Sequence, residues 1–223
     1  MFKTETHLHV SEVSRCSHLT AAEMMEYYHK AGFSTVFVTD HLNPAYYEDH
    51  GETPEERADW FMSGFENAKK AGYALGINVI FATEMHLRGT HNHYLLYNVP
   101  RDFLLIAPTL FDKTPADLYA KAKEYGITVV QAHPFRDGNC TPTPECADAL
   151  EVINPNPRHE NFDDKAIEIA KKHSLPMTSG SDAHRPEDIG NGGVITEKEI
   201  KTTNDYLDAL FGGKLTLMGG KEQ

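Results

Sequence analysis

Short apolar runs alternate along the chain with longer amphipathic stretches. A first run lies near residues 2–9, and further runs fall at 34–40, 78–84, 93–99, 127–133, 149–154 and 174–182. Several of these runs are apolar without strict alternation, which is typical of strands covered on both faces. The pattern therefore predicts about seven buried strands.

The stretches between the runs carry signals for helix starts. Thr20 with Glu23 has the spacing of a capping box. Two further helices are expected where a threonine at the N-cap is followed by proline and, three residues after the threonine, by an acidic residue: Thr53-Pro54 with Glu56, and Thr114-Pro115 with Asp117. A fourth helix is expected to start at Asn161, with acidic residues near its positive end, and to finish near His173.

Repeated alternation of strand and helix implies parallel strands joined by right-handed crossovers. About seven strands in 223 residues favour a small, distorted α/β barrel, with an open doubly wound sheet as the alternative. The length suits a single domain over residues 1–223. The apolar runs are too short to cross a membrane and no signal peptide is evident, so we expect a cytoplasmic protein without a membrane partner.

Composition narrows the classes of function. A net charge of −12 argues against a protein that coats nucleic acid, but it leaves a small phosphorylated substrate open because bound cations can reverse the local charge. The spacing of Cys16, Cys140 and Cys146 fits neither a disulfide framework nor a CxxC zinc site, which predicts free thiols. The chain has 13 histidines, so their positions matter, because histidine is a common metal ligand.

Residues that can bind metal ions recur where the predicted strands end. These residues are His7, His9, Asp40, His41, Glu84, His133, Asp182 and His184. The carboxyl ends of barrel strands converge on one rim, so these side chains are expected to share one mouth. Residues i and i+2 of a strand project to the same side, which lets a His-x-His pair bind one cation. His93 begins its run instead, and it reaches the rim if its strand is antiparallel or its loop folds back.

These residues belong to a longer ordered series. It consists of His7-Leu8-His9, Thr39-Asp40-His41, Glu84, His93, Ala132-His133-Pro134 and Ser181-Asp182-Ala183-His184. The series resembles the PHP superfamily, named after polymerase and histidinol phosphatase, over nearly the whole chain. This resemblance implies a distorted (β/α)7 barrel, two or three divalent metal ions (zinc, manganese or iron) and hydrolysis of phosphate esters.

Carried over to this sequence, the resemblance implies three cation sites. It assigns His7, His9, Glu84 and Asp182 to the first site. Glu84 bridges to the second site, which also contains His93 and His133. His41 and His184 belong to the third site. It makes Glu84, Asp182 and His184 the expected catalytic residues.

The chain departs from the family pattern in two places. Glu5 stands where the family usually has aspartate, and we expect it to orient a ligand histidine. Arg15 stands where a third-site histidine or acid is common. Glu12, Cys16 and His18 are the candidates to replace that ligand, and we favour Glu12 because a carboxylate can reach back across a tight loop.

The expected chemistry is consistent with these residue types. Mixed imidazole and carboxylate ligands suit zinc, manganese or iron, and a bridging carboxylate sets two cations roughly 3.5–4 Å apart for displacement at phosphorus. Arginine can grip a phosphate with two parallel hydrogen bonds. Three arginines lie close in sequence to proposed ligands and are either substrate-binding residues or solvated surface charges: Arg15, Arg136 and Arg185.

Two alternative functions remain open. The chain could be a metal-binding PHP module without significant catalysis, or an amidohydrolase-like enzyme that cleaves a C–N bond, although the lysine typical of that group is not evident. The segment 42–65 is expected to supply either a lid or, as we favour, the core face of the helix beginning at Pro54. The aromatic residues concerned are Tyr46, Tyr47, Trp60 and Phe61.

Overall fold

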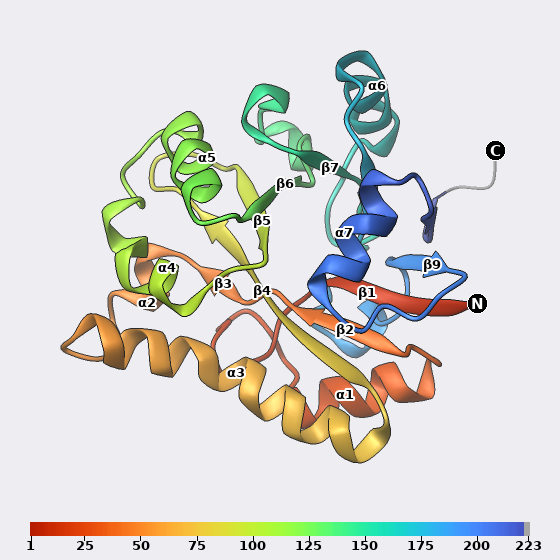
Figure 1. Ribbon diagram of the computed structural model, residues 1–223, viewed down its shortest axis with the longest axis horizontal. Helices are drawn as coiled ribbons and strands as arrows, with labels where there is room; N and C mark the ends of the chain where they lie inside the picture. Colours follow the sequence, from red (N-terminus) through yellow and green to blue (C-terminus); the bar gives the residue numbers. More distant parts are fainter. Residues whose placement is uncertain (221–223) are drawn as a thin grey trace.

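The central sheet of the computed structural model, which describes residues 1–220, curves until its ends nearly meet (Figure 1). Its strands follow the order β10-β9-β1-β2-β4-β5-β6-β7-β8, with β3 paired to β4. Leu8 at the end of β1 forms a parallel bridge with Ala183, beyond β8. Seven strands, β1, β2 and β4 to β8, therefore form a nearly closed barrel, as the distorted α/β barrel prediction required.

The strands agree with the predicted runs, and three short strands were not predicted. The bounds are β1 Phe2–Leu8, β2 Thr35–Val38, β3 His41–Leu42, β4 Asn78–His86, β5 His93–Tyr97, β6 Thr128–Ala132, β7 Ala149–Ile153, β8 Met177–Ser179, β9 Val194–Thr196 and β10 Thr216–Leu217. The additional strands are β3, β9 and β10.

Strand direction differs from the fully parallel expectation. β1, β2 and β4 are parallel to one another, as are β6, β7 and β8. β5 runs antiparallel to both β4 and β6, because the loop 87–92 is too short for a helical crossover. β9 and β10 are also antiparallel to their neighbours. The reversal of β5 places His93 at the same end of the barrel as the carboxyl ends of the parallel strands.

The helices lie on the outside of the barrel, except the helix Thr203–Phe211, which packs Tyr206 into the barrel interior. Their bounds are α1 Ala21–Lys30, α2 Pro44–Tyr47, α3 Pro54–Leu75, α4 Arg101–Ile106, α5 Pro115–Glu124, α6 Asp163–His173 and α7 Thr203–Phe211, with short 3-10 helices at Ala107–Thr109, Arg136–Gly138, Pro144–Cys146 and Pro186–Asp188. Within residues 1–220, none of the helices combines the length and the apolar character that crossing a membrane requires.

The predicted helix starts hold in three cases and fail in one. Thr20, Thr53 and Thr114 each cap a helix through a reciprocal capping box. The start predicted at Asn161 is wrong, because α6 begins at Asp163 after Phe162, whose left-handed backbone has a φ of 50°. The Asn161 side chain instead donates a hydrogen bond to the carbonyl oxygen of Asn154 at 2.6 Å.

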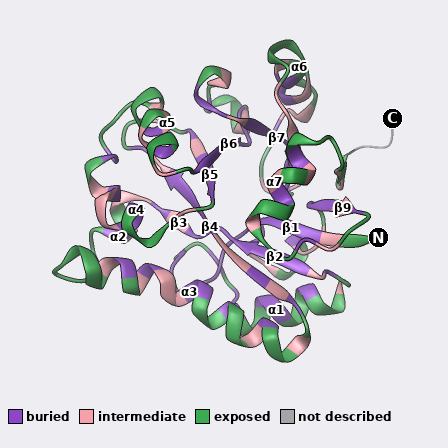
Figure 2. Ribbon diagram, viewed as in Figure 1, coloured by how far each residue is buried: buried purple, intermediate pink, exposed green. Residues whose placement is uncertain are grey.

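The strands of the barrel are largely buried (Figure 2), and alternate residues of a strand belong to two different apolar layers. In β2, Val36 and Val38 pack in the layer beneath α1 and α3, while Phe37 packs inside the barrel with Tyr97 and Tyr206. The strands are therefore buried on both faces, as their unbroken apolar runs indicated. Burial on both faces leaves the ends of the barrel as the places where polar side chains can gather.

The seam between β1 and the segment after β8 is unusually tight. A Cβ atom on Gly180 would lie 2.5 Å from the Cβ of His7 and 2.6 Å from Oε1 of Glu151, so only glycine fits there. The buried Glu5 carboxylate joins the two sides, because its Oε1 accepts hydrogen bonds from the backbone N–H groups of His7 at 3.0 Å and Ser181 at 2.9 Å. Glu5 thus fixes the backbone and does not contact a ligand imidazole, contrary to the expectation.

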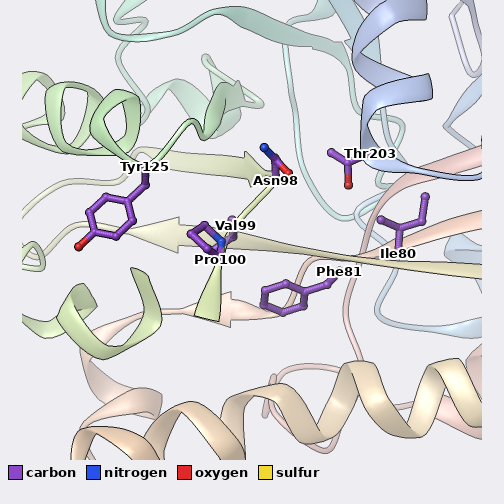
Figure 3. Close-up of a pocket in the computed structure, with 7 residues that line it drawn as sticks. All are labelled: Ile80, Phe81, Asn98, Val99, Pro100, Tyr125 and Thr203. Carbon is purple, nitrogen blue, oxygen red and sulfur yellow. The ribbon is translucent and has the colours of Figure 1, made fainter. Parts of the chain in front are cut away.

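The opposite end of the barrel contains a cavity of about 310 Å³ (Figure 3). It is lined by Ile80, Phe81, Asn98, Val99, Pro100, Tyr125 and Thr203. Ile80 and Phe81 belong to the first half of β4, whereas Glu84 belongs to its second half. The cavity is therefore separate from the histidines and carboxylates singled out in the sequence.

Candidate metal centre

The carboxyl ends of the parallel strands, together with the start of β5, bring the histidines and carboxylates of the motif series into one cluster. Ligand-type atoms within 4.8 Å of one another form four overlapping sets: His7, Glu84 and His133; His7, His9 and Asp182; His41, Glu84 and His93; and His9, His41 and His184. Every metal ligand expected from the sequence except Glu12 is in this cluster. We call it the metal centre.

Glu84 lies at the middle of the metal centre. Its Oε1 is 3.0 Å from Nε2 of His133 and 2.9 Å from Nδ1 of His93. Its Oε2 is 2.8 Å from Nδ1 of His41 and 3.5 Å from Nε2 of His9. Because the two oxygens face different histidines, this single carboxylate has the geometry of a bridge between two cations.

Both buried carboxylates of the centre favour the ionised form. Burial opposes ionisation of Glu84, but the charges of His93, His7 and His41 hold its pKa well below its usual range. Burial likewise opposes ionisation of Asp182, and Arg136 and His7 hold its pKa well below the usual value. Negative charge is therefore maintained in the interior, where it attracts cations.

Several buried atoms of the centre lack hydrogen-bond partners among the described residues. They are Oε2 of Glu84, Oδ1 and Oδ2 of Asp182, and Nδ1 of His41, His93 and His133. Some lie close to each other without hydrogen-bond geometry, as Nδ1 of His41 and Oε2 of Glu84 do at 2.8 Å. Buried polar atoms are normally satisfied, so converging atoms of this kind fit divalent cations.

Three ligand histidines are oriented by their second ring nitrogen. Nδ1 of His7 donates to Oε1 of Glu151 at 2.9 Å, and Nδ1 of His184 donates to the carbonyl oxygen of Asp182 at 2.8 Å. Nδ1 of His9 lies 3.3 Å from the Ser14 hydroxyl. These contacts leave Nε2 of each ring free for a cation, as is usual for metal-binding histidine.

Glu151 is a functional residue that the sequence reasoning missed. This buried residue of β7 also accepts hydrogen bonds from the backbone N–H of His133 at 3.1 Å and from Nδ2 of Asn154 at 2.8 Å. It thereby fixes two ligand-bearing segments at once. The available signal was a glutamate inside an apolar strand, since a buried carboxylate requires partners.

Two proposed ligands have unusual backbone conformations. His133 has a φ of 28° and Asp182 a φ of 49°, in the left-handed region that residues with a side chain rarely adopt. Such conformations persist where the surrounding contacts enforce them, and they are frequent at functional sites. Here the hydrogen bond from Asn156 to the carbonyl oxygen of Asp182, at 3.1 Å, is one of the contacts that hold the backbone.

The third-site loop places its residues differently from the prediction. The Glu12 carboxylate accepts hydrogen bonds from the backbone N–H of Ala21 at 3.0 and 3.1 Å, so it caps α1, and it belongs to none of the four ligand sets found among the described residues. Cys16 lies in the same loop, near His41 and His184, but its thiol likewise belongs to none of those four sets. Burial raises the pKa of this thiol, but hydrogen bonds to His184 and His41 lower it to about 6.

The three candidate phosphate-binding arginines occupy different environments. Arg136 is only 14% exposed, and its Nη1 lies 2.7 Å from Oδ2 of Asp182. Arg15 is exposed and lies 3.2 Å from Asp49. Arg185 is partly exposed and lies 4.0 Å from Glu187. Arg136 therefore contacts the metal centre directly, whereas Arg15 and Arg185 pair with acidic residues at the surface.

The aromatic residues of segment 42–65 mostly belong to the core. Tyr47 and Phe61 are buried, and the Tyr47 hydroxyl donates to the carbonyl oxygen of Leu104 at 2.7 Å. Trp60 stacks on His50 with ring centroids 3.6 Å apart. Tyr46 is the exception, because its ring lies 6.2 Å from that of His41, beside the metal centre. The core interpretation is thus confirmed for Tyr47 and Phe61.

Solved structures with the same fold include proteins named as a phosphoesterase, an endonuclease and an amidohydrolase. A two-domain protein from Bacteroides vulgatus that contains a predicted PHP-like metal-dependent phosphoesterase matches with a TM-score of 0.72 and 17% identity, over 97% of this chain and 64% of that one. A lesion-specific endonuclease from Pyrococcus furiosus matches with a TM-score of 0.67 and 19% identity, over 97% of this chain and 57% of that one. This chain thus spans less than two thirds of either protein.

A third structure is named for a different reaction. An amidohydrolase from Chromobacterium violaceum, with bound sulfate and no metal, matches with a TM-score of 0.55 and 16% identity, over 84% of this chain and 90% of that one. At 16% identity the likeness shows that the two proteins share a fold, and it does not show that they share a reaction. No curated protein matches the sequence.

A family model described as PHP-associated matches residues 160–215, which include α6, β8 and the Asp182 segment. That match and the shared barrel support membership of this chain in the PHP superfamily. These findings agree with the family resemblance recognised in the sequence, and the donor atoms of the site suggest divalent metal binding.

Proposed function

We propose that this protein is a metal-dependent phosphoesterase that hydrolyses a small phosphorylated molecule. The observation that carries the proposal is the position of Glu84, whose two oxygens face separate groups of histidines. A carboxylate bridge between two cations is the arrangement used for in-line displacement at phosphorus. Zinc, manganese and iron are the expected cations, because the donor set mixes imidazole with carboxylate.

The cations would be held by residues that already converge. Glu84 with His93 and His133 would hold one cation, and Glu84 with His7, His9 and Asp182 would hold the other. Divalent cations bound there supply Lewis acidity that stabilises charge on phosphoryl oxygens and lowers the pKa of water.

The three arginines near the metal centre would position either a ligand carboxylate or the substrate phosphate. Arg136 is fixed by Oδ1 of Asn154 at 2.9 Å and by Oδ1 of Asn161 at 3.0 Å, and it holds the Asp182 carboxylate in place. Arg15 and Arg185 are exposed enough to meet a substrate phosphate. A net charge of −12 disfavours a polyanionic partner, so a small substrate is the better fit.

Metal analysis and turnover test the proposal together. Purified protein should contain at least about two transition-metal equivalents per chain, and it should release phosphate from an aryl phosphate or from a panel of phosphorylated metabolites. Chelation should abolish turnover, and manganese or zinc should restore it. A fully loaded preparation with about one equivalent or fewer would contradict the bridged site.

C–N bond hydrolysis is a second candidate, because the amidohydrolase from Chromobacterium violaceum shares the fold. The same metal-loaded preparation should be assayed with amide and cyclic-amide substrates. Hydrolysis of these, without phosphate release, would favour the second candidate. A loaded protein inactive towards both classes would be a metal-binding module.

A further inference from the structure

The loop between β7 and α6 contacts both neighbouring loops that carry proposed ligands. Its residues 154–161 read Asn-Pro-Asn-Pro-Arg-His-Glu-Asn, and each proline fixes its own φ and restricts the backbone of the asparagine before it. On one side, the Asp137 carboxylate accepts a hydrogen bond from the backbone N–H of Glu160 at 3.0 Å and lies 2.7 Å from Nδ1 of His159. The loop is therefore stiff in its first half, and its second half is tied to the segment that follows His133.

Arg158 reaches across to the other side, to the segment that follows β8. Its Nη1 donates to Oδ1 of Asp188 and its Nη2 donates to Oδ2, both at 2.7 Å. Oδ2 of Asp188 also accepts hydrogen bonds from the backbone N–H groups of His184 and Arg185, both at 2.9 Å. The Arg158 side chain is thus linked through one carboxylate to the backbone of a proposed metal ligand.

The Asp188 carboxylate depends on these donors because it is completely buried. A buried carboxylate is costly unless it is paired and hydrogen-bonded, and two parallel bonds from a guanidinium are the strongest pairing available to it. Without Arg158 the carboxylate would turn towards water. The N–H groups of His184 and Arg185 would then lose their acceptor, and the segment that carries His184 would loosen.

A second route leads from the same residue to Asp182. The backbone N–H of Arg158 donates to Oδ1 of Asn156 at 3.1 Å, and Nδ2 of Asn156 donates to the carbonyl oxygen of Asp182 at 3.1 Å. Arg158 therefore holds the segment after β8 at both of its proposed ligands, through its side chain at His184 and through its backbone at Asp182.

We propose that Arg158 is a positioning residue of the metal centre, which acts through Asp188 on the backbone of His184. The proposal rests on the proposed metal-dependent function, because the ligands that it concerns belong to the same centre. Partners that orient metal ligands contribute to metal affinity, and their loss typically lowers it by about 10–100-fold. Both terminal nitrogens of Arg158 bind Asp188, so this arginine is poorly placed to grip a substrate phosphate.

Metal affinity separates positioning from a purely structural role. Arg158→Met keeps a long side chain and removes the charge. We expect its affinity for zinc, measured by competition with a chromophoric chelator, to fall by about 10–100-fold, with circular dichroism unchanged. Arg101→Met, a matched change at an exposed arginine that pairs with Asp59, should bind zinc as the wild type does. Wild-type affinity in folded Arg158→Met would overturn the proposal.

A second variant decides the question if Arg158→Met does not fold, since that change leaves a buried carboxylate without its cation. Asp188→Asn removes the buried charge at constant volume and leaves one oxygen for donors that now share two. We expect a loss of zinc affinity of the same order. Unchanged affinity in folded Asp188→Asn would also overturn the proposal, because Asp188 is the residue through which the Arg158 side chain acts.

Steady-state kinetics at saturating metal distinguish Arg158 from a substrate-binding residue. We expect kcat for an aryl phosphate to fall in Arg158→Met, while KM stays within about twofold of the wild type. A raised KM with normal zinc affinity would contradict the proposal and make Arg158 a substrate-binding residue. Weakened zinc binding in the variants of a protein that hydrolyses no phosphate ester would retain the positioning role and reject the phosphoesterase proposal. Phosphate ester hydrolysis with unchanged zinc affinity in both variants would do the reverse.

Discussion

The two ends of the barrel differ in what their side chains can do, although both are built on the same strands. In β4, Ile80 and Phe81 line the cavity at one end, and Glu84, three residues later, lies at the middle of the metal centre. The described residues that line the cavity end include no histidine, cysteine or carboxylate (Figure 3). In this protein the candidate functional site is marked by converging ligand atoms, and the cavity lies at the other end of the barrel.

The largest effect should come from replacing Glu84 at the metal-centre end. Glu84→Gln removes the charge that offsets two nearby cations while keeping the volume. We expect turnover to fall about 100-fold or more and about one metal equivalent to be lost, with circular dichroism unchanged. Glu145→Gln, a matched change at an exposed residue, should retain activity. Near-normal turnover in Glu84→Gln would mean that the bridge lies elsewhere.

Replacing Glu151 should weaken the same end indirectly. Its carboxylate accepts hydrogen bonds from His7, from the backbone of His133 and from Asn154. Glu151→Gln cannot satisfy all three donors, because its amide nitrogen would face a donor. We expect metal affinity to fall by about 10–100-fold, measured by competition with a chromophoric chelator. Wild-type affinity would show that the orientation of His7 does not depend on this carboxylate.

The metal-centre end should also respond to pH. Burial opposes protonation of His41, but the charge of Glu84 raises its pKa to about 10, and the pKa of His7 also lies well above its usual value. In the metal-free protein both rings are therefore protonated on both nitrogens and positively charged at neutral pH. A cation that binds either ring must displace one of these protons. Zinc affinity should rise by about tenfold per pH unit for each displaced proton between pH 6.5 and 9, as titration calorimetry can measure. A flat profile would exclude protonated ligands.

The smallest effect is expected at the cavity end. Tyr125→Phe removes only the hydroxyl of a partly buried ring that packs on Phe103, at a centroid distance of 5.5 Å. Turnover and metal content should stay within about twofold of the wild type, and the free energy of unfolding should change by about 0.5 kcal/mol or less. A large loss of turnover would mean that this end communicates with the metal centre, and the contrast between the two ends would fail.

Features encoded locally in the sequence were predictable. The capping boxes at Thr20, Thr53 and Thr114 involve residues three apart, so their spacing in the sequence was enough to predict where these helices begin. The strand-end histidines were recognisable because one kind of residue recurred at one structural position. The family resemblance then supplied the order of the motifs.

Features set by tertiary contacts were not predictable. Glu151 reaches His7 across 144 positions of sequence, and no local pattern indicates that pairing. Glu12 and Cys16 lie in one loop, and only the folded path decides that the first caps α1 while the second lies near His41. The direction of β5 was left open in the sequence, where an antiparallel strand was one of two ways for His93 to reach the rim, and it depended on the shortness of loop 87–92.

The seam that closes the barrel has a consequence for how the protein is made. His7 and Asp182 come within 3.4 Å of each other only when β1 meets the segment after β8. During synthesis, a ribosome must therefore release most of the barrel before these two ligands can meet, and their pairing carries the entropic cost of closing a long loop. A cation held by both His7 and Asp182 would therefore bind only after the barrel closes, and its binding would stabilise the closed barrel against unfolding.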